Sequence, residues 1–381
     1  MLLPTRNGGP YLDECIRSVL VDPSPDLELV VSDNANDDST PQVLDSFAAD
    51  PRLRVLRQPQ VISVVENWNR ALEAATGDYL LMIGDDDLLL RSCVPTIREL
   101  VERFDEPDCI TYNAFSFVSP ASFEAEDGDA HFSESHFLFD SGFRSGQLLT
   151  AEQRRQIVVD YFRFLPRLPL NMQTTVVARK ALYRLNPPVF RAPFPDHIAL
   201  CGLLLTAERW LYSDTRPLII GVSPKSFGHY VYSGEHASGL DYLGVDTSFP
   251  GALPGNPLVN GMHQWLTVVA TLYRDHLSGV QVSRRDYVAR QLWAWYVQTR
   301  QGRLGYAEFT RHLRLLGLRD WLRLVGIAFD PTFVRQAAKR VRSRRGTDLV
   351  WPRLERLAGV ATIEQFRDFI EARQHDDSER N

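Results

Sequence analysis

The first 118 residues alternate short strand patterns with short helix patterns, and this alternation constrains the fold more than any other feature of the chain. Apolar runs typical of strands lie at 2–5, 27–31, 53–56, 79–83 and 109–117. Helical spacing of apolar residues lies between them, at 11–20, 40–47, 66–75 and 92–104. Repeated β-α units of this length predict a Rossmann-like α/β fold, a mostly parallel sheet with helices on both faces.

The pattern changes twice further along the chain. Residues 119–149 are acidic and rich in Ser and Gly, and we predict an excursion or lid there. Regular patterns resume with a helix at 152–162, a strand at 172–178, a helix at 196–208 and a strand at 218–222. From about residue 255 the pattern of apolar residues is helical. This part of the sequence is rich in Trp, Leu and Arg, and no strands are expected in it. We therefore predict an α/β domain over 1–254, an α-helical C-terminal extension over 255–374 and a disordered tail over 375–381.

Composition excludes several classes of protein. The 381 residues are 44% hydrophobic and 24% charged, as in a soluble globular protein, and the net charge of −6 gives no bulk attraction to nucleic acid. Four cysteines without metal-ligand spacing indicate reduced thiols and a cytoplasmic protein. No apolar run reaches the roughly 18 residues that span a bilayer, and no signal-peptide pattern is present. The chain begins almost inside its first strand, so we expect that strand to be clipped.

Asp85, Asp86 and Asp87 stand directly after the apolar run 79–83. The carboxyl end of a buried parallel strand is a common place for chemistry. Three adjacent carboxylates repel one another, and Mg²⁺ or Mn²⁺ would neutralise them. The alternative is a solvated acidic turn that caps the helix beginning near Leu89.

Two other polar segments are expected at the same sheet edge, at 4–7 and 32–34. A nucleotide site needs such convergence: an acceptor for the base, a cation for the diphosphate and loop N–H groups for the sugar. Each residue also has a local interpretation, because Asn7 and Asn34 suit turns and Asp33 suits the start of the NDDST turn.

The runs PTRNGGPYLDECIRSVL, LELVVSDNANDDST and ENWNRALEAATGDYLLMIGDDDLL resemble the family 2 glycosyltransferases, which have a GT-A fold. The resemblance covers residues 1–118 closely and extends loosely to about 235. It implies an inverting hexosyltransferase that moves a sugar from a nucleotide-diphosphate donor to an acceptor. It also implies that Pro4, Thr5 and Arg6, with Asn7, line the nucleotide pocket and that Asp33 contacts the base.

By the same resemblance the aspartate run is the family's DXD motif, which holds Mn²⁺ or Mg²⁺ and touches the ribose and diphosphate. The motif fits in two registers, and we favour Asp87 or Asp86 over Asp85 as metal ligands, with Asp85 and Asp86 on the donor. Where many members have Arg-Asn, this chain has Trp68-Asn69. Trp68 either stacks on the base or packs in the core. We favour a UDP-sugar because it is the commonest donor in the family.

Inverting transfer needs a general base, which the family places at the start of a helix after the metal motif. Asp196 in APFPDHIALCGLLL fits this position. Its alternative role is that of a first-turn acid stabilised by the helix dipole. The family's paired acid is missing, because Pro195 precedes Asp196 and His197 follows it. His197 either assists or is an ordinary first-turn residue.

The loop 223–230 lies where related enzymes close over the donor phosphates. We predict that Lys225 neutralises the leaving diphosphate and that His229 completes the coordination of the cation. The alternative is that both side chains are simply solvated.

The segment 311–345 has ten Arg or Lys against two Asp, with apolar residues nearby. Such a segment suits peripheral contact with the inner face of a membrane, or packing of an apolar stripe on the α/β domain. Acceptor specificity would lie in 119–149, in 171–175 and in the helical extension. The acceptor is a saccharide, a lipid-linked saccharide or a small molecule, and the oligomeric state has no sequence signal.

Two other functions fit the sequence less well. A nucleotidyltransferase would have a longer glycine-rich loop than NGGP, followed by a basic residue. A non-catalytic nucleotide-sugar-binding or scaffold protein would not need Asp33, the aspartate run and Asp196 together.

Overall fold

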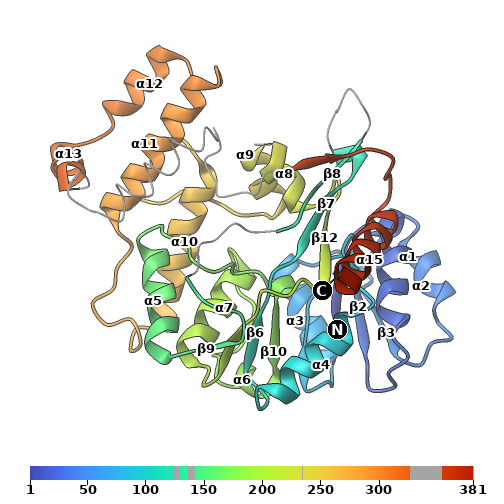
Figure 1. The fold of residues 1–381 in the computed structure, drawn as a ribbon. Helices are drawn as coiled ribbons and strands as arrows, with labels where there is room; N and C mark the ends of the chain where they lie inside the picture. The colour runs from blue at the N-terminus through green and yellow to red at the C-terminus, as the bar shows by residue number, and fades with distance from the viewer. Residues whose placement is uncertain (123–128, 136–141, 234, 327–353, 381) are drawn as a thin grey trace.

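The computed structural model describes residues 1–122, 129–135, 142–233, 235–326 and 354–380 (Figure 1). Its central sheet begins with three parallel strands in the order β3-β2-β1. On the far side of β1, Leu2 pairs in parallel with Met82, and the Ile83 N–H donates to the Leu2 carbonyl at 2.9 Å. The strands are β1 (Leu2–Thr5), β2 (Leu29–Asp33), β3 (Leu53–Arg57) and β4 (Tyr79–Leu80). The carboxyl ends of β1 and β2 and the residues after Ile83 therefore meet at one edge, as predicted.

Helices cover both faces of this sheet, also as predicted. Leu2 and Val30 point to the face covered by α3, whereas Leu3 and Val31 point to the face covered by α1, α2 and α4. Successive side chains of a strand point to opposite faces, so the continuous apolar runs need a helix layer on each side. The helices are α1 (Gly9–Leu20), α2 (Thr40–Ser46), α3 (Val64–Ala74) and α4 (Cys93–Arg103).

Beyond β4 the sheet continues in the order β4-β10-β6-β11-β9, with mixed strand directions. The strand predicted over 109–117 is two strands in different sheets, β6 and β7. Tyr112 and Asn113 lie between them, and their N–H groups donate to Thr174 and Thr215 respectively. The strand predicted over 172–178 begins as the 3-10 turn η2 (Met172–Thr174). The strands are β6 (Cys109–Thr111), β9 (Gln147–Leu149), β10 (Thr175–Ala178) and β11 (Trp210–Tyr212).

A second sheet has the order β13-β8-β7-β12-β5 and includes a strand from the C-terminal part of the chain. The prediction of no strands after residue 255 is wrong, because β13 pairs with β8. Phe366 of α15 is fully buried against Phe115, Phe117 and Phe132. Helix α15 runs to Arg380, through the stretch predicted as a disordered tail. The elements are β5 (Leu88–Leu89), β7 (Phe115–Val118), β8 (Ala130–Ser133), β12 (Leu218–Val222), β13 (Glu355–Leu357) and α15 (Ile363–Arg380), with η1 (Pro120–Ser122) after β7.

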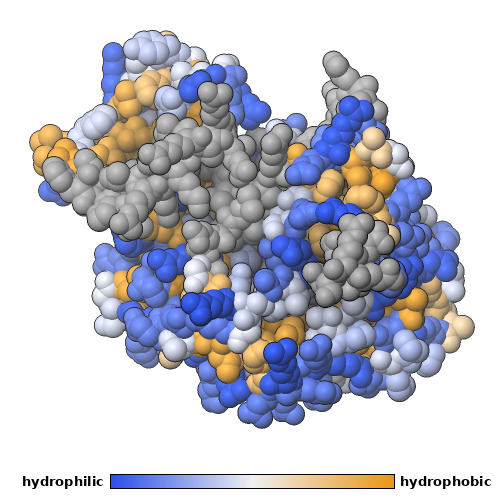
Figure 2. All heavy atoms as spheres, viewed as in Figure 1, coloured by the Kyte–Doolittle hydropathy of each residue, from blue (hydrophilic) through white to orange (hydrophobic). Residues whose placement is uncertain are grey.

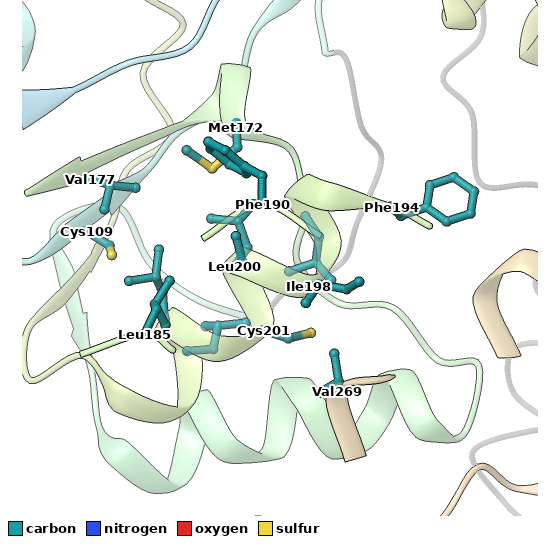
Figure 3. Packing of buried hydrophobic residues seen from close by; sticks show 14 of the residues in the cluster. Cys109, Met172, Val177, Leu185, Phe190, Phe194, Ile198, Leu200, Cys201 and Val269 are labelled. Atoms are coloured by element: carbon teal, nitrogen blue, oxygen red, sulfur yellow. The ribbon is translucent and has the colours of Figure 1, made fainter. Parts of the chain in front are cut away.

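The remaining helices pack beside the central sheet. Figure 3 shows Leu200 and Ile198 of α7 among Met172, Phe190 and, from α10, Val269. This packing joins the helical C-terminal region to the α/β region. The helices are α5 (Ala151–Phe162), α6 (Arg179–Leu182), α7 (Pro195–Thr206), α8 (Phe227–Ser233), α9 (His236–Tyr242), α10 (Pro257–Leu272), α11 (Arg284–Arg300), α12 (Tyr306–Leu313) and α13 (Leu318–Val325). Within the described residues, no helix has the length and apolar character to cross a membrane.

Candidate functional site

The turn after β1 is locked to the turn after β2. Arg6 Nη1 donates to the Ala35 carbonyl at 2.6 Å and pairs with Asp37 at 3.3 Å. Asn7 has a left-handed backbone with φ of 58°, which Asn tolerates better than most residues. Its side-chain oxygen accepts from the Asp37 N–H at 3.2 Å. Side chains of the segment 4–7 thus hold it to the backbone of the turn that follows the segment 32–34.

Asp33 is buried at the end of β2 and organises the turn that follows it. Its Oδ1 accepts from the Asn36 N–H at 3.1 Å and from Asn36 Nδ2 at 2.6 Å. Its Oδ2 lies 3.5 Å from Arg57 Nη1. Asp33 thus organises the turn that follows it, as its local interpretation predicts. Its contact with a nucleotide base remains a prediction.

Trp68 is half-buried on α3, with its ring at right angles to Phe190 and the ring centroids 5.3 Å apart. The neighbouring Asn69 donates to the Phe190 carbonyl at 2.9 Å and accepts from its N–H at 3.1 Å. This pair of residues therefore fastens α3 to the segment that precedes α7. The core-packing interpretation of Trp68 describes its observed contacts.

Asp85 faces the turn after β1. Its Oδ2 accepts from Thr5 Oγ1 at 2.6 Å, and its Oδ1 accepts from Lys225 Nζ at 3.1 Å. Lys225 also donates to the Asn7 carbonyl at 2.7 Å. Gly8 is needed beside them, because a Cβ at that position would lie 2.4 Å from Asp85 Oδ2. Residues far apart in the chain thus form one polar cluster, with the Lys225 ammonium against the carboxylate.

Asp87 faces the other way, into the protein. Its Oδ2 accepts from the Gly84 N–H at 2.6 Å and from Gln173 Nε2, and its Oδ1 accepts from the Gly221 N–H at 3.0 Å. Both oxygens therefore have protein donors. Asp87 joins the turn after residue 83 to η2 and to β12.

Asp86 lies between these two environments. Its Oδ2 accepts from Ser223 Oγ at 2.6 Å and from the Ser223 N–H at 3.2 Å. Its Oδ1 has no donor among the described residues. Burial, reinforced by Asp87 and Asp85, raises the pKa of Asp86 to about 7. Burial also raises the pKa of Asp87, to about 6, although its hydrogen bonds oppose this shift. Positive charge placed here would favour the ionised forms of both.

Asp196 lies in the first turn of α7, directly after Pro195. Its Oδ1 accepts from the His197 N–H at 2.9 Å and lies 2.7 Å from His197 Nδ1. The imidazole packs between Phe194 and Trp265, with ring centroids 5.4 and 5.2 Å away. These rings restrict the imidazole, and the imidazole in turn orients the carboxylate. Among the described residues, no hydrogen bond links Asp196 to the aspartate run.

The loop after β12 is partly helical, since α8 begins at Phe227 and occupies the second half of the stretch 223–230 predicted as a loop. His229 lies on α8, and its ring contacts Tyr230 at a centroid distance of 5.4 Å. Its Nδ1 is buried without a hydrogen-bond partner. In the described part of the chain, no hydrogen bond or ion pair joins His229 to the aspartates. Its role toward a cation remains a prediction.

Sequence reasoning missed three residues that hold the aspartates. Ser223 and Gln173 donate to Asp86 and Asp87, and Gly221 allows β12 to pass close by, since a Cβ there would lie 1.8 Å from the Asp86 carbonyl oxygen. Ser223 and Gln173 lay in segments assigned to the donor loop and to acceptor specificity. Their proximity depends on strand order, which a local pattern does not contain.

The N-terminal part of the chain is similar to known proteins. Residues 1–150 match the model of the family described as Glycosyl transferase family 2. Glycosyltransferase GlyG of Streptococcus pneumoniae is 25% identical over 133 residues, 35% of this chain and 42% of that protein. The GalNAc(5)-diNAcBac-PP-undecaprenol beta-1,3-glucosyltransferase of Campylobacter jejuni is 30% identical over 101 residues, 26% of this chain and 33% of that protein. The matches thus span less than half the length of these relatives.

Solved structures give looser matches. The S. aureus TarS 1–349 complex with UDP has a TM-score of 0.45 and 16% identity, over 96% of this chain and 98% of that chain. Mannosyltransferase PcManGT from Pyrobaculum calidifontis, in complex with GDP-Man and Mn²⁺, has a TM-score of 0.40 and 14% identity, over 84% and 85% of the two chains. Residues 1–150 of this chain are therefore similar to glycosyl transferase family 2.

Proposed function

We propose that this chain is an inverting hexosyltransferase with a GT-A domain. It moves a sugar from a nucleotide-diphosphate donor, with a UDP-sugar favoured, to an acceptor hydroxyl. The similarity of residues 1–150 to the model of glycosyl transferase family 2 supports the reaction class. The observation that carries the proposal is the cluster of Thr5, Asp85 and Lys225, whose side chains are joined by hydrogen bonds at one edge of the sheet.

The cluster suits a diphosphate because it combines a cationic side chain with carboxylates that can share a metal ion. Lys225 already lies against Asp85, so its ammonium is available to a phosphate oxygen at the same place. The turn that holds Arg6 and Asn7 lies alongside through the Lys225 contact with the Asn7 carbonyl. We assign Pro4, Arg6 and Asp33 to the nucleoside end of the donor.

The residues present fit a divalent cation held by few protein ligands. Mg²⁺ and Mn²⁺ commonly take one or two carboxylates together with substrate phosphates. Asp86 Oδ1 accepts no hydrogen bond in the described structure. The partners of Asp85 are side chains, which can move away when a cation binds to the carboxylate. We assign Asp86 as the principal ligand, with Asp85 beside it, and Asp87 as the residue that anchors the turn. When bound, the cation would supply positive charge that stabilises the departing nucleoside diphosphate.

The proposed base is Asp196. The acceptor oxygen forms a bond to the anomeric carbon while the bond from that carbon to the phosphate oxygen breaks, and Asp196 takes the acceptor proton. Asp196 lies in the first turn of α7, at the positive end of the helix dipole. His197 holds the carboxylate in one orientation.

The donor is tested first by a thermal-shift screen of nucleotide sugars with Mn²⁺. The selected donor is then incubated with the protein with and without Mn²⁺, and release of the nucleoside diphosphate is measured. A transferase slowly hydrolyses its donor only with the metal. Binding without hydrolysis under any condition would instead support a non-catalytic protein.

Asp196→Asn separates the base from the donor site. It should leave donor affinity within about twofold and lower transfer by at least about 10²-fold, the range for loss of a general base. The exposed Asp275 offers a matched control, since Asp275→Asn makes the same change on the surface. Retained transfer by Asp196→Asn would remove it from this role.

The cellular setting is part of the same proposal. The four cysteines are all free and buried, as expected of a protein in the cytoplasm. A saccharide or a lipid-linked saccharide is the proposed acceptor. Peripheral contact with a membrane was predicted for 311–345, of which 327–345 lies outside the described residues.

A further inference from the structure

Helix α13 presents an apolar stripe to solvent. Leu318, Trp321, Leu322 and Val325 follow one another at helical spacing and are 76%, 43%, 64% and 63% exposed. Leu315, just before the helix, is 53% exposed. Figure 2 shows hydrophobic atoms gathered at the end of the molecule where Figure 1 labels α13. Isolated exposed leucines are ordinary, but a contiguous stripe on one helix indicates an interaction surface.

An ion pair, rather than the stripe, holds this helix on the protein. Asp320 is buried, and its two oxygens pair with Arg284 of α11 at 3.2 and 3.1 Å. Leu316 and Leu324 add apolar contacts on the same inner side. A surface helix usually turns its apolar face to the core. Here the bidentate pair sets the rotation of α13, so the apolar face points away from the core.

Arginines surround the stripe. Arg311, Arg314, Arg319 and Arg323 are exposed on α12, α13 and the turn between them. Arg323 lies near Asp320, and no described carboxylate pairs with the other three. The surface is therefore apolar at its centre and cationic at its edge.

We infer that this surface docks on an anionic lipid bilayer. Leucines and a tryptophan suit the boundary between headgroups and acyl chains, and arginines suit lipid phosphates. A second copy of this chain would bring the same arginines against these, and like charges oppose such a contact. The following segment 327–353 has seven Arg or Lys against two Asp, so it is cationic too and a poor complement. The inference concerns a surface remote in sequence from the transferase residues and does not depend on the proposed function.

The test is co-sedimentation of the full chain with vesicles. We expect binding to vesicles of equal phosphatidylglycerol and phosphatidylcholine in 50 mM NaCl. We expect at least about tenfold weaker partitioning to phosphatidylcholine alone, or in 500 mM NaCl, because the charge term is screened. Leu318→Glu with Leu322→Glu should weaken binding to the anionic vesicles by at least about 100-fold, since it removes two leucines that the bilayer would bury and adds repulsion.

Charge is tested separately. Arg314→Gln with Arg319→Gln should weaken binding about 25-fold, roughly fivefold for each arginine. Val21→Glu with Val61→Glu is the matched control, because both valines are more than half exposed elsewhere on the molecule. Circular dichroism melts should be unchanged in all variants, since the altered side chains are on the surface.

Three outcomes would overturn the inference. One is a wild-type chain that does not sediment with anionic vesicles. Another is equal loss of binding in the Val21 and Val61 control. The third is a concentration-dependent dimer, seen by analytical ultracentrifugation, that the leucine variant abolishes while vesicle binding is absent; the occupant of the stripe would then be a second copy. Vesicle binding with no donor hydrolysis would contradict the proposed function alone.

Discussion

Asp86 and Asp87 are neighbours of the same residue type, and we expect their removal to have opposite consequences. Asp87→Ala deletes an acceptor that serves the Gly84 N–H, the Gly221 N–H and Gln173. Each donor left without a partner costs about 1–3 kcal/mol. Part of this loss is offset, because the variant no longer buries a carboxylate whose pKa is raised. We therefore expect the free energy of unfolding to fall by about 3 kcal/mol.

Asp86→Ala should affect metal-dependent UDP binding rather than stability. It removes an acceptor from Ser223 only, and it relieves the repulsion among three carboxylates. Its free energy of unfolding should change by less than about 1 kcal/mol, the net value of an ordinary hydrogen bond. Because Asp86 Oδ1 is the oxygen we assign to the cation, the Mn²⁺-dependent part of the UDP affinity should be lost.

Urea unfolding measures the free energy of unfolding of each variant. Titration calorimetry of UDP with and without Mn²⁺ measures the Mn²⁺-dependent part of the UDP affinity. Asp87→Ala should keep its UDP affinity within about threefold when measured well below its unfolding transition. An Asp87→Ala protein of unchanged stability that has lost Mn²⁺-dependent binding would refute the division of roles and make Asp87 the ligand.

Three further outcomes are expected. The pKa of Asp86 lies near 7 in the folded protein against an ordinary 3.8, so the folded state holds this proton more tightly than the unfolded chain and ionisation of Asp86 costs stability as pH rises. Metal-free Asp86→Asn should therefore exceed the wild type in urea stability at pH 8, and the gap should shrink toward pH 5; a gap independent of pH would contradict this. Gly221→Ala should lower the melting temperature or prevent folding, because its Cβ would lie 1.8 Å from the Asp86 carbonyl oxygen. Lys225→Met should weaken UDP binding about tenfold in calorimetry, the value of one charge-assisted hydrogen bond, whereas Lys180→Met on the surface should not.

The elements of the first 104 residues follow from local pattern. The other observed strands and helices begin and end within about two residues of the predicted ranges, but β4 ends at Leu80, three residues early, and the short β5 was not predicted. This works because an apolar strand that is buried on both faces has a continuous run, and the helices between have a 3.6-residue period. Strand order in a parallel β-α unit then brings residues 4–7 and 85–87 to one edge.

Residues 109–117 show a feature that local pattern does not predict. One long apolar strand and two short ones in different sheets have the same composition. The break at Tyr112 and Asn113 exists because their N–H groups find acceptors at Thr174 and Thr215. Those partners are distant in sequence, and no periodicity within the segment records them. The strand β13 was missed for the same reason, since its partner is β8 in the region expected to be a lid.

The aspartate run in the candidate site shows the same division between what the sequence predicts and what tertiary structure decides. Its position after a buried strand, and the cost of three adjacent carboxylates, were determined by the sequence alone. Their separate roles were decided by tertiary structure, because their partners Gly221, Ser223 and Lys225 lie 134, 137 and 140 residues further along the chain. A carboxylate such as Asp87, whose two oxygens both accept from backbone N–H groups, is an anchor, and one such as Asp86, with an oxygen left open, can bind a cation. Which of the two an aspartate becomes depends on the donors that folding brings to it.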